Sequence, residues 1–186
     1  MAEAFHPEQQ RALEYLARKG THAPLDVLRS QVRAAFDTIE RLFDDVAPEE
    51  WDRSPAAGKW SPHQILDHLV LSHGPAIAQL ESLLAGVTPD GVAIPAGLQS
   101  AANELREWIA LRDRLDAIHR ELLRLIDSAS DGISLEPKAV VEMVVKVDGK
   151  PRHWYEFLDW KAFVQGIRVH TLEHRDQLRR TLNRPE

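Results

Sequence analysis

The chain has 186 residues, a formal net charge of −6 and no cysteine. This length suits one domain, and a hydrophobic fraction of 44% is enough to bury a core without cross-links. The lack of cysteine excludes disulfides, thiolate zinc sites, iron–sulfur clusters and a cysteine nucleophile. The nine histidines are therefore the main candidates for metal or acid–base chemistry.

The charge and hydropathy of the chain limit its partners. An acidic surface repels phosphate groups, so we predict that the protein does not bind nucleic acid. A basic run near the end of the chain is expected to stabilise the last turns of a helix. It comprises Arg175, Arg179, Arg180 and Arg184. We find no signal-peptide pattern and no stretch of about 18 apolar residues, so we predict a cytoplasmic protein that does not engage a membrane.

The spacing of apolar residues predicts helices over most of the chain. A short amphipathic segment at residues 8–19 is expected to form an extra N-terminal helix. Pro24 opens a longer helix that stops before Pro48, and Ser61 with Pro62 is typical of the start of another, over 62–85. A connection rich in glycine and proline, at 86–97, precedes a third long helix over 98–127.

The helical pattern is interrupted before the last helix, which is expected over 158–182. Residues 140–147 are rich in β-branched side chains, and Asp148-Gly149 is a strong signal for a two-residue hairpin turn. We therefore predict an all-α domain over residues 1–186, a four-helix bundle with an N-terminal extension at 1–22 and a small β-hairpin inserted at 139–157. The connection at 86–97 is long enough to allow its two flanking helices to run parallel, but does not require it.

Two histidines lie in the apolar stripe of the last predicted helix. His170 and His174 are four residues apart, so their rings project side by side and could bind one metal ion. Gln177 lies on the same face and is a candidate hydrogen-bonding partner. Two core histidines would show the same spacing, so a metal site needs a third ligand from another helix.

Three histidines could supply that ligand: His68, His73 and His119. The apolar periodicity favours His73 and His119 as core-facing and places His68 at the edge of its stripe. If the two helices are antiparallel, His68 and His73 both lie at nearly the same position along the helix axes as His170 and His174. Spacing alone therefore leaves the choice open.

The segment WSPHQILDHL, from Trp60 to Leu69, followed by a distant His170-x-x-x-His174-x-x-Gln177, resembles the DinB-like superfamily, particularly its YfiT-like branch. The resemblance covers roughly residues 25–182. It implies an up-down-down-up four-helix bundle. It also implies a metal triad with one histidine from the second bundle helix and two from the fourth, which maps onto His68, His170 and His174. The N-terminal extension and the hairpin depart from the family pattern.

Three imidazole ligands leave a coordination position open, as in catalytic metal sites. The ion could be zinc, nickel, iron or manganese, since all accept imidazole. The resemblance implies a metal-dependent enzyme acting on small molecules, either a hydrolase or a transferase of a low-molecular-weight thiol, with metal-activated water or thiol as nucleophile. A thiol would arrive as cosubstrate, and no further catalytic residue is assigned. A non-catalytic metal- or small-molecule-binding bundle in a stress response, a helical interaction module and a homodimer are kept as alternatives.

Residues 170–174 also spell H-x-x-E-H, a zinc-peptidase signature in which the glutamate acts as base. That site needs a further ligand downstream, where Glu186 is the only carboxylate beyond the last helix. Glu173 points about 60° away from His170 around the helix, so we expect a solvated or outer-shell carboxylate rather than a base. Trp60 is expected to pack onto the core. The hairpin residues His153, Trp154 and Tyr155 are expected either to line a pocket or to pair across the strands.

Overall fold

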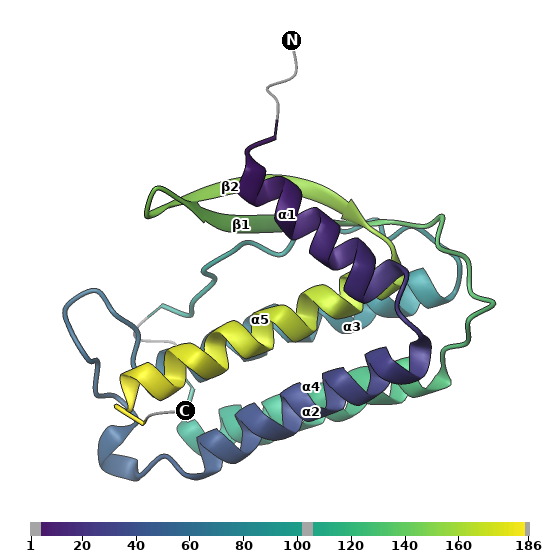
Figure 1. Ribbon diagram of the computed structural model, residues 1–186. Helices are drawn as coiled ribbons and strands as arrows, with labels where there is room; N and C mark the ends of the chain where they lie inside the picture. The colour runs from purple at the N-terminus through teal and green to yellow at the C-terminus, as the bar shows by residue number, and fades with distance from the viewer. Residues whose placement is uncertain (1–4, 102–105, 185–186) are drawn as a thin grey trace.

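The computed structural model describes residues 5–101 and 106–184. Four helices form the bundle: α2 (Leu25–Asp44), α3 (Pro62–Leu84), α4 (Trp108–Ser128) and α5 (Trp160–Thr181). In Figure 1, α2 and α5 run in one direction, whereas α3 and α4 run in the other. Helix α2 packs beside α5, and α3 packs beside both α4 and α5. The predicted up-down-down-up bundle is confirmed.

Local capping explains where the two helices that carry the histidine triad begin. The Ser61 side chain accepts the backbone N–H of Gln64, the Gln64 side chain accepts the backbone N–H of Ser61, and Pro62 occupies the first turn of α3. The Asp159 carboxylate accepts two backbone N–H groups in the first turn of α5. Both starts lie where the sequence places them, to within two residues.

The predicted hairpin is confirmed. Strands β1 (Ala139–Val147) and β2 (Lys150–Leu158) pair antiparallel, and Met143 lies opposite Trp154. Asp148 and Gly149 form the turn with φ values of 51° and 76°, as a two-residue turn with left-handed geometry requires. The hairpin lies across the bundle on the side of α5, beside the N-terminal helix (Figure 1).

The N-terminal extension consists of α1 (Pro7–Leu16) and a single π-helical turn, η1 (Ala17–Thr21), that packs against α5. Gly20 permits this approach. A Cβ atom at residue 20 would lie 2.7 Å from the Cα atom of Ala162, which is closer than any side chain tolerates. Gly20, which directly follows the predicted N-terminal helix, thus allows η1 to contact α5, although the two are far apart in the sequence.

The third long helix begins ten residues later than predicted, at Trp108 rather than at residue 98. Residues 98–101 run outside any helix, and the predicted helical residues 102–105 lie outside the described residues. The Asp67 carboxylate on α3 accepts both the backbone N–H and the hydroxyl of Ser100, each at 2.8 Å. These bonds to α3 outweigh the weak helical preference that charge spacing gave the segment.

The hydrophobic core fills the space between the four bundle helices, and its largest fully buried side chains include Phe36, Phe43 and Trp160. A short 3-10 turn, η2 (Pro48–Glu50), follows α2. Within the described parts of the chain, no helix is long and apolar enough to cross a membrane.

Candidate metal centre

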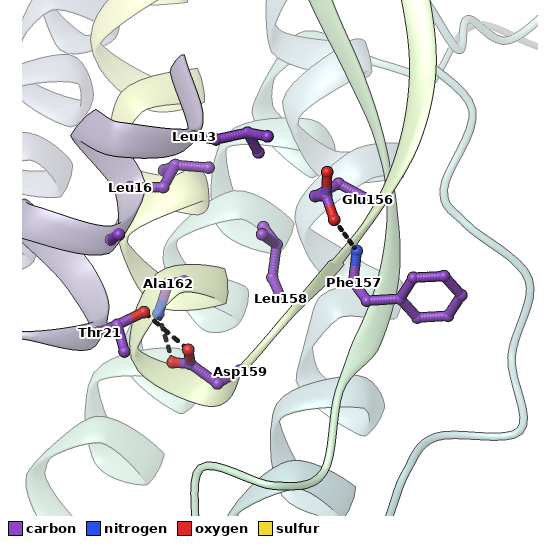
Figure 2. Close-up of a pocket in the computed structure, with 9 residues that line it drawn as sticks. Leu13, Leu16, Thr21, Glu156, Phe157, Leu158, Asp159 and Ala162 are labelled. Atoms are coloured by element: carbon purple, nitrogen blue, oxygen red, sulfur yellow. Dashed lines mark hydrogen bonds between the residues drawn. The ribbon is translucent and has the colours of Figure 1, made fainter. Parts of the chain in front are cut away.

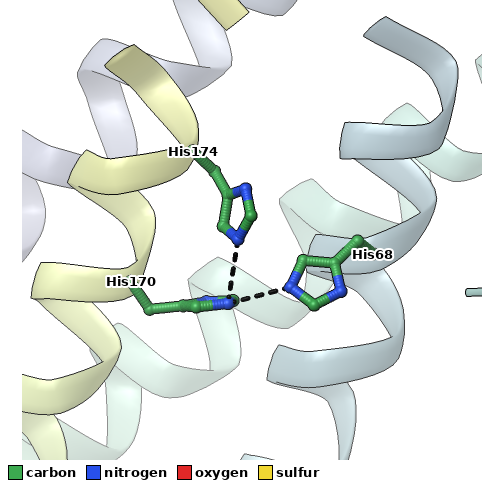
Figure 3. A group of neighbouring side chains, drawn as sticks. All are labelled: His68, His170 and His174. Atoms are coloured by element: carbon green, nitrogen blue, oxygen red, sulfur yellow. Dashed lines mark hydrogen bonds between the residues drawn. The ribbon is translucent and has the colours of Figure 1, made fainter. Parts of the chain in front are cut away.

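The structure brings together the three histidines that the sequence selected. His68 comes from α3, and His170 and His174 come from successive turns of α5 (Figure 3). The Nε2 atom of His170 lies 2.9 Å from Nε2 of His68 and 3.1 Å from Nε2 of His174. One ring nitrogen from each residue lies within 4.8 Å of the others, a separation that one metal ion can bridge.

Neighbouring oxygen atoms fix the tautomers of two of these rings. Nδ1–H of His68 donates to the carbonyl oxygen of Leu98 at 2.8 Å, and Nδ1–H of His174 donates to Oε1 of Gln177 at 2.9 Å. A neutral imidazole carries one N–H, so Nε2 of each ring holds a lone pair. The contact with Gln177 was predicted. The contact with Leu98 was not, because it depends on the segment that the sequence assigned to a helix.

The environment keeps the three rings neutral. Burial is the main cause that lowers the pKa of His68. Burial, followed by repulsion from neighbouring imidazoles, lowers the pKa of His170 well below its ordinary value and that of His174 to about 3. Metal binding requires the neutral ring, so these imidazoles need not lose a proton at neutral pH before they bind an ion.

The two alternative histidines form a second layer behind His170. His73 turns Nε2 toward Nδ1 of His170 at 3.1 Å and Nδ1 toward Nε2 of His119, also at 3.1 Å. Both are buried, as their periodicity predicted. His68, which the periodicity placed at the edge of the stripe, is just as buried, with an exposure of 2%. The crossing segment that contains Leu98 covers this face of α3.

A cavity of about 450 Å³ opens in front of the three Nε2 atoms. Apolar side chains make most of its wall, including Ile94 from the connection after α3, Phe163 and Ile167 from α5, and Val141 and Met143 from β1. The hairpin that the sequence marked as an insertion therefore forms the roof of the site.

Two expectations about aromatic residues change in the structure. Trp60 does more than pack onto the core, because its ring lines the cavity and stacks on His174 with centroids 5.9 Å apart. On the hairpin, His153 lines the cavity, whereas Tyr155 is 66% exposed and Trp154 lies against Phe5. Sequence alternation could not separate His153 from Tyr155, because residues two apart in a strand lie on the same face of it.

Glu142 fastens the roof to the segment that crosses below it. Its carboxylate accepts the backbone N–H of Ala96 at 2.6 Å and lies 2.9 Å from Nδ1 of His153. These two contacts, the first the stronger, hold the pKa of Glu142 below its ordinary value. The charged form is therefore the one that joins β1, β2 and the connection between α3 and α4.

A second, smaller hollow of about 230 Å³ lies between η1, β2 and α5 (Figure 2). The hydroxyl of Thr21 donates to Oδ2 of Asp159 at 2.7 Å, and Oδ1 of Asp159 caps α5. Leu16 and Leu158 line both hollows. The polar groups of Thr21 and Asp159 satisfy each other and the helix end, so this hollow presents no converging ligand atoms from these residues.

The peptidase alternative gains no support from the arrangement. Glu173 lines the edge of the cavity and is exposed. Glu186 lies outside the described residues. Within residues 5–101 and 106–184, the one group that could hold a metal consists of three histidines and includes no carboxylate.

The family model described as the DinB superfamily matches residues 31–138, more than half of the chain. The chain belongs to the DinB superfamily. No curated protein matches it. The DinB fold of the chain is similar to the crystal structure of a mycothiol-dependent maleylpyruvate isomerase, with a TM-score of 0.60 and 13% identity over 84% of this chain and 61% of that one. The chain thus spans about three fifths of the isomerase.

YfiT from Bacillus subtilis, described as a probable metal-dependent hydrolase with an unusual four-helix bundle topology, matches over the whole chain and 94% of its own length. The TM-score is 0.56 and the identity 16%. At these identities both likenesses show the DinB fold alone. They agree with the up-down-down-up order that the resemblance implied.

A third structure similar to this chain corrects the predicted partners. The colibactin self-resistance protein ClbS was crystallised in complex with double-stranded DNA, and it matches 87% of this chain with a TM-score of 0.57 and 16% identity. The prediction that excluded nucleic acid was therefore wrong. Net charge sums over the whole surface, whereas a duplex contacts one face, so a total of −6 does not decide the question.

Proposed function

We propose that the protein is a divalent-metal-dependent enzyme that activates a water or a thiol against a small substrate, with His68, His170 and His174 as the metal ligands. The observation that carries this proposal is the convergence of their Nε2 atoms at the floor of an apolar cavity. The family, and a neighbour described as metal-dependent, support the same reading.

The donor set fits a cation. The Nε2 lone pairs of His68 and His174 both point at Nε2 of His170, an atom that has room for at most one proton and so could not satisfy both of them. An ion between the rings would satisfy all three. Three imidazoles suit zinc, nickel, iron or manganese and leave a position open toward the cavity. When bound, such an ion supplies a Lewis acid that lowers the pKa of a water or thiol.

The cavity indicates the kind of substrate. Its wall is mainly apolar, and among the described residues that line it the charged side chains are the two acids Glu142 and Glu173, with no lysine or arginine. An anionic substrate would meet no fixed cation of the chain there. We therefore propose a small, neutral and largely apolar electrophile, held against Trp60 and the valines of β1 while the roof limits the entry of water.

Metal analysis tests the ligand assignment. Protein purified without an affinity tag should carry, or take up, close to one transition-metal ion per chain. His68→Ala and His170→Ala should lose that ion, whereas His63→Ala should keep it. His63 is a matched control because it lies on α3 and contacts Asp52 and the carbonyl of Arg106, outside the triad. A wild-type protein that neither carries nor accepts an ion would overturn the proposal.

Turnover tests the enzymatic part. Metal-loaded wild type and His170→Ala should be compared on low-molecular-weight thiols paired with neutral electrophiles, and on neutral esters and amides. We expect wild-type rates well above those of His170→Ala with at least one substrate class. Equal rates would contradict catalysis at this site. Stoichiometric metal without turnover of any class would favour a non-catalytic metal-binding bundle.

A further inference from the structure

A continuous chain of side chains runs from the surface of α2 to the triad. Oε1 of Glu40 lies 2.5 Å from Nδ1 of His119, Nε2 of His119 lies 3.1 Å from Nδ1 of His73, and Nε2 of His73 lies 3.1 Å from Nδ1 of His170. Each of the four bundle helices contributes one residue, in the order α2, α4, α3 and α5. This series of hydrogen-bonded side chains therefore crosses the whole bundle and ends at His170, a proposed metal ligand.

The carboxylate at one end sets the direction of every bond. An ionised carboxylate only accepts, so Nδ1–H of His119 must donate to Glu40. A neutral ring has one N–H, so Nε2 of His119 accepts from Nδ1–H of His73, and Nε2 of His73 accepts from Nδ1–H of His170. The lone pair of His170 is then left on Nε2, the atom that faces His68 and His174.

The surroundings hold these rings neutral and fix their planes. Burial is the main cause that lowers the pKa of His119 and, further, that of His73. Both side chains are at most 2% exposed, so water does not offer them other partners. The ring of Phe36 stacks on His119 with centroids 3.8 Å apart and planes within 3°. His119 is thereby held where both of its nitrogens reach their partners.

We propose that Glu40, His119 and His73 form a positioning chain that holds His170 in the tautomer and orientation needed to present Nε2 to a metal ion. A hydrogen bond from the outer nitrogen of a metal-binding imidazole toward a carboxylate orients the ring and raises its basicity. Here that carboxylate acts through two further imidazoles. The proposal rests on the proposed metal site, but it concerns residues that the family triad does not include.

The metal affinity of a set of variants tests the positioning chain. The probe is Co²⁺, because its absorption spectrum also reports the geometry of its ligands. His119→Phe keeps the ring stacked on Phe36 but removes both hydrogen bonds, and it should weaken Co²⁺ binding about 10-fold or more. Glu40→Gln removes the charge and should cause a smaller loss in the same direction. The double variant should bind no worse than His119→Phe alone, because Glu40 acts through His119. His63 lies in the same bundle but is not part of the positioning chain, so His63→Phe should bind Co²⁺ like the wild type.

Long-range ¹H–¹⁵N correlation spectra of the histidine rings give a readout that a merely structural role would not change. In wild type, His73 and His119 should both carry the proton on Nδ1. In His119→Phe, His73 loses its acceptor at Nδ1 and should shift toward the Nε2–H tautomer, which reverses its bond with His170. An Nε2–H tautomer of His73 in the wild type would overturn the proposal.

The outcomes separate this proposal from the proposed function. If the wild type binds Co²⁺ and the Glu40 and His119 variants bind it equally tightly, the positioning chain is wrong and the metal site stands. If the wild type binds no ion, both the metal site and the positioning role fail.

Discussion

Two hollows lie along α5, one at the histidine triad and one at the junction of η1, β2 and α5, and both share the side chains of Leu16 and Leu158. In the junction hollow the polar groups of Thr21 and Asp159 bond to each other and to a helix end. In the histidine cavity the Nε2 atoms face one another and the open space. Neighbouring hollows of one fold thus differ in whether polar atoms are satisfied inside the protein, and this difference separates a structural contact from a candidate site.

Acid should affect the histidine cavity most strongly. Five histidines of the bundle, three of them buried and two partly buried, have a pKa below the ordinary value of 6.5. They are His68, His73, His119, His170 and His174. Below pH 6.5 the unfolded chain therefore binds more protons than the folded one, and stability falls as pH falls toward the folded values, about 3 for His174. Each histidine contributes up to about 1.4 kcal/mol per pH unit.

Guanidinium unfolding of metal-free protein at pH 7.5, 6 and 5 measures this effect, which should sum to several kcal/mol. The His119→Phe variant should lose stability less steeply with pH, because one neutral ring has been removed. Constant stability of the wild type between pH 7.5 and pH 5 would contradict the neutral histidine cluster.

A metal ion should stabilise the protein through the same cavity. An ion at 100 times its Kd raises the free energy of unfolding by about 2.7 kcal/mol if it binds only the folded chain. Thermal unfolding with and without Zn²⁺ should show this increase in the wild type, with reversal by a chelator. His170→Ala should show no increase, while the junction variant Thr21→Val should respond like the wild type. A wild-type response retained by His170→Ala would place the ion elsewhere.

The junction should be the more sensitive of the two regions to added volume. Gly20→Ala places a Cβ against the backbone of Ala162 and should lower stability by about 1–3 kcal/mol. Gly166→Ala on α5 is the matched control, since the nearest atom to its added Cβ is Cδ1 of Leu158 at 3.9 Å. In a helix that change is expected to be neutral or stabilising by up to about 1 kcal/mol. Chemical denaturation compares the two, and equal effects would show that η1 can move away from α5.

The smallest expected effect concerns the hydrogen bond within the junction. Thr21→Val keeps the shape of the side chain but removes its bond to Asp159. The free energy of unfolding should fall by about 1 kcal/mol, and metal affinity should not change. Denaturation and Co²⁺ titration on the same preparation measure both quantities. A change in metal affinity would show that the two hollows are coupled through their shared leucines.

Elements with strong local signals were predictable. The start of α3 at Pro62 follows from a capping box that lies within four consecutive residues, and the hairpin follows from Asp148-Gly149 between two strands of the correct composition. The start of α4 was not predictable, because Asp67 holds Ser100 from a different part of the chain. A hydrogen bond between two distant segments cannot be recognised from the apolar periodicity of either one.

The candidate site likewise has a part that the sequence could predict and a part that it could not. Four-residue spacing on an apolar stripe was enough to pair His170 with His174, and the motif resemblance selected His68. Neither signal could assign His73 and His119 to a second layer, since both are core-facing histidines at suitable depth. Glu40 had no signal at all, because it lies 79 residues from His119 in the chain and meets it only across the packed α2 and α4.

The sequence by itself determined the family, the helical bundle, the hairpin and the absence of thiol chemistry from the chain's own side chains. These properties depend on residue types and on local spacing. Only the tertiary structure decided which nitrogen of each ring is free, which histidines stand behind others, and that the hairpin roofs the cavity. The physical reason is that a tautomer and a cavity wall are set by partners that packing brings from distant helices, and periodicity within one helix does not contain them.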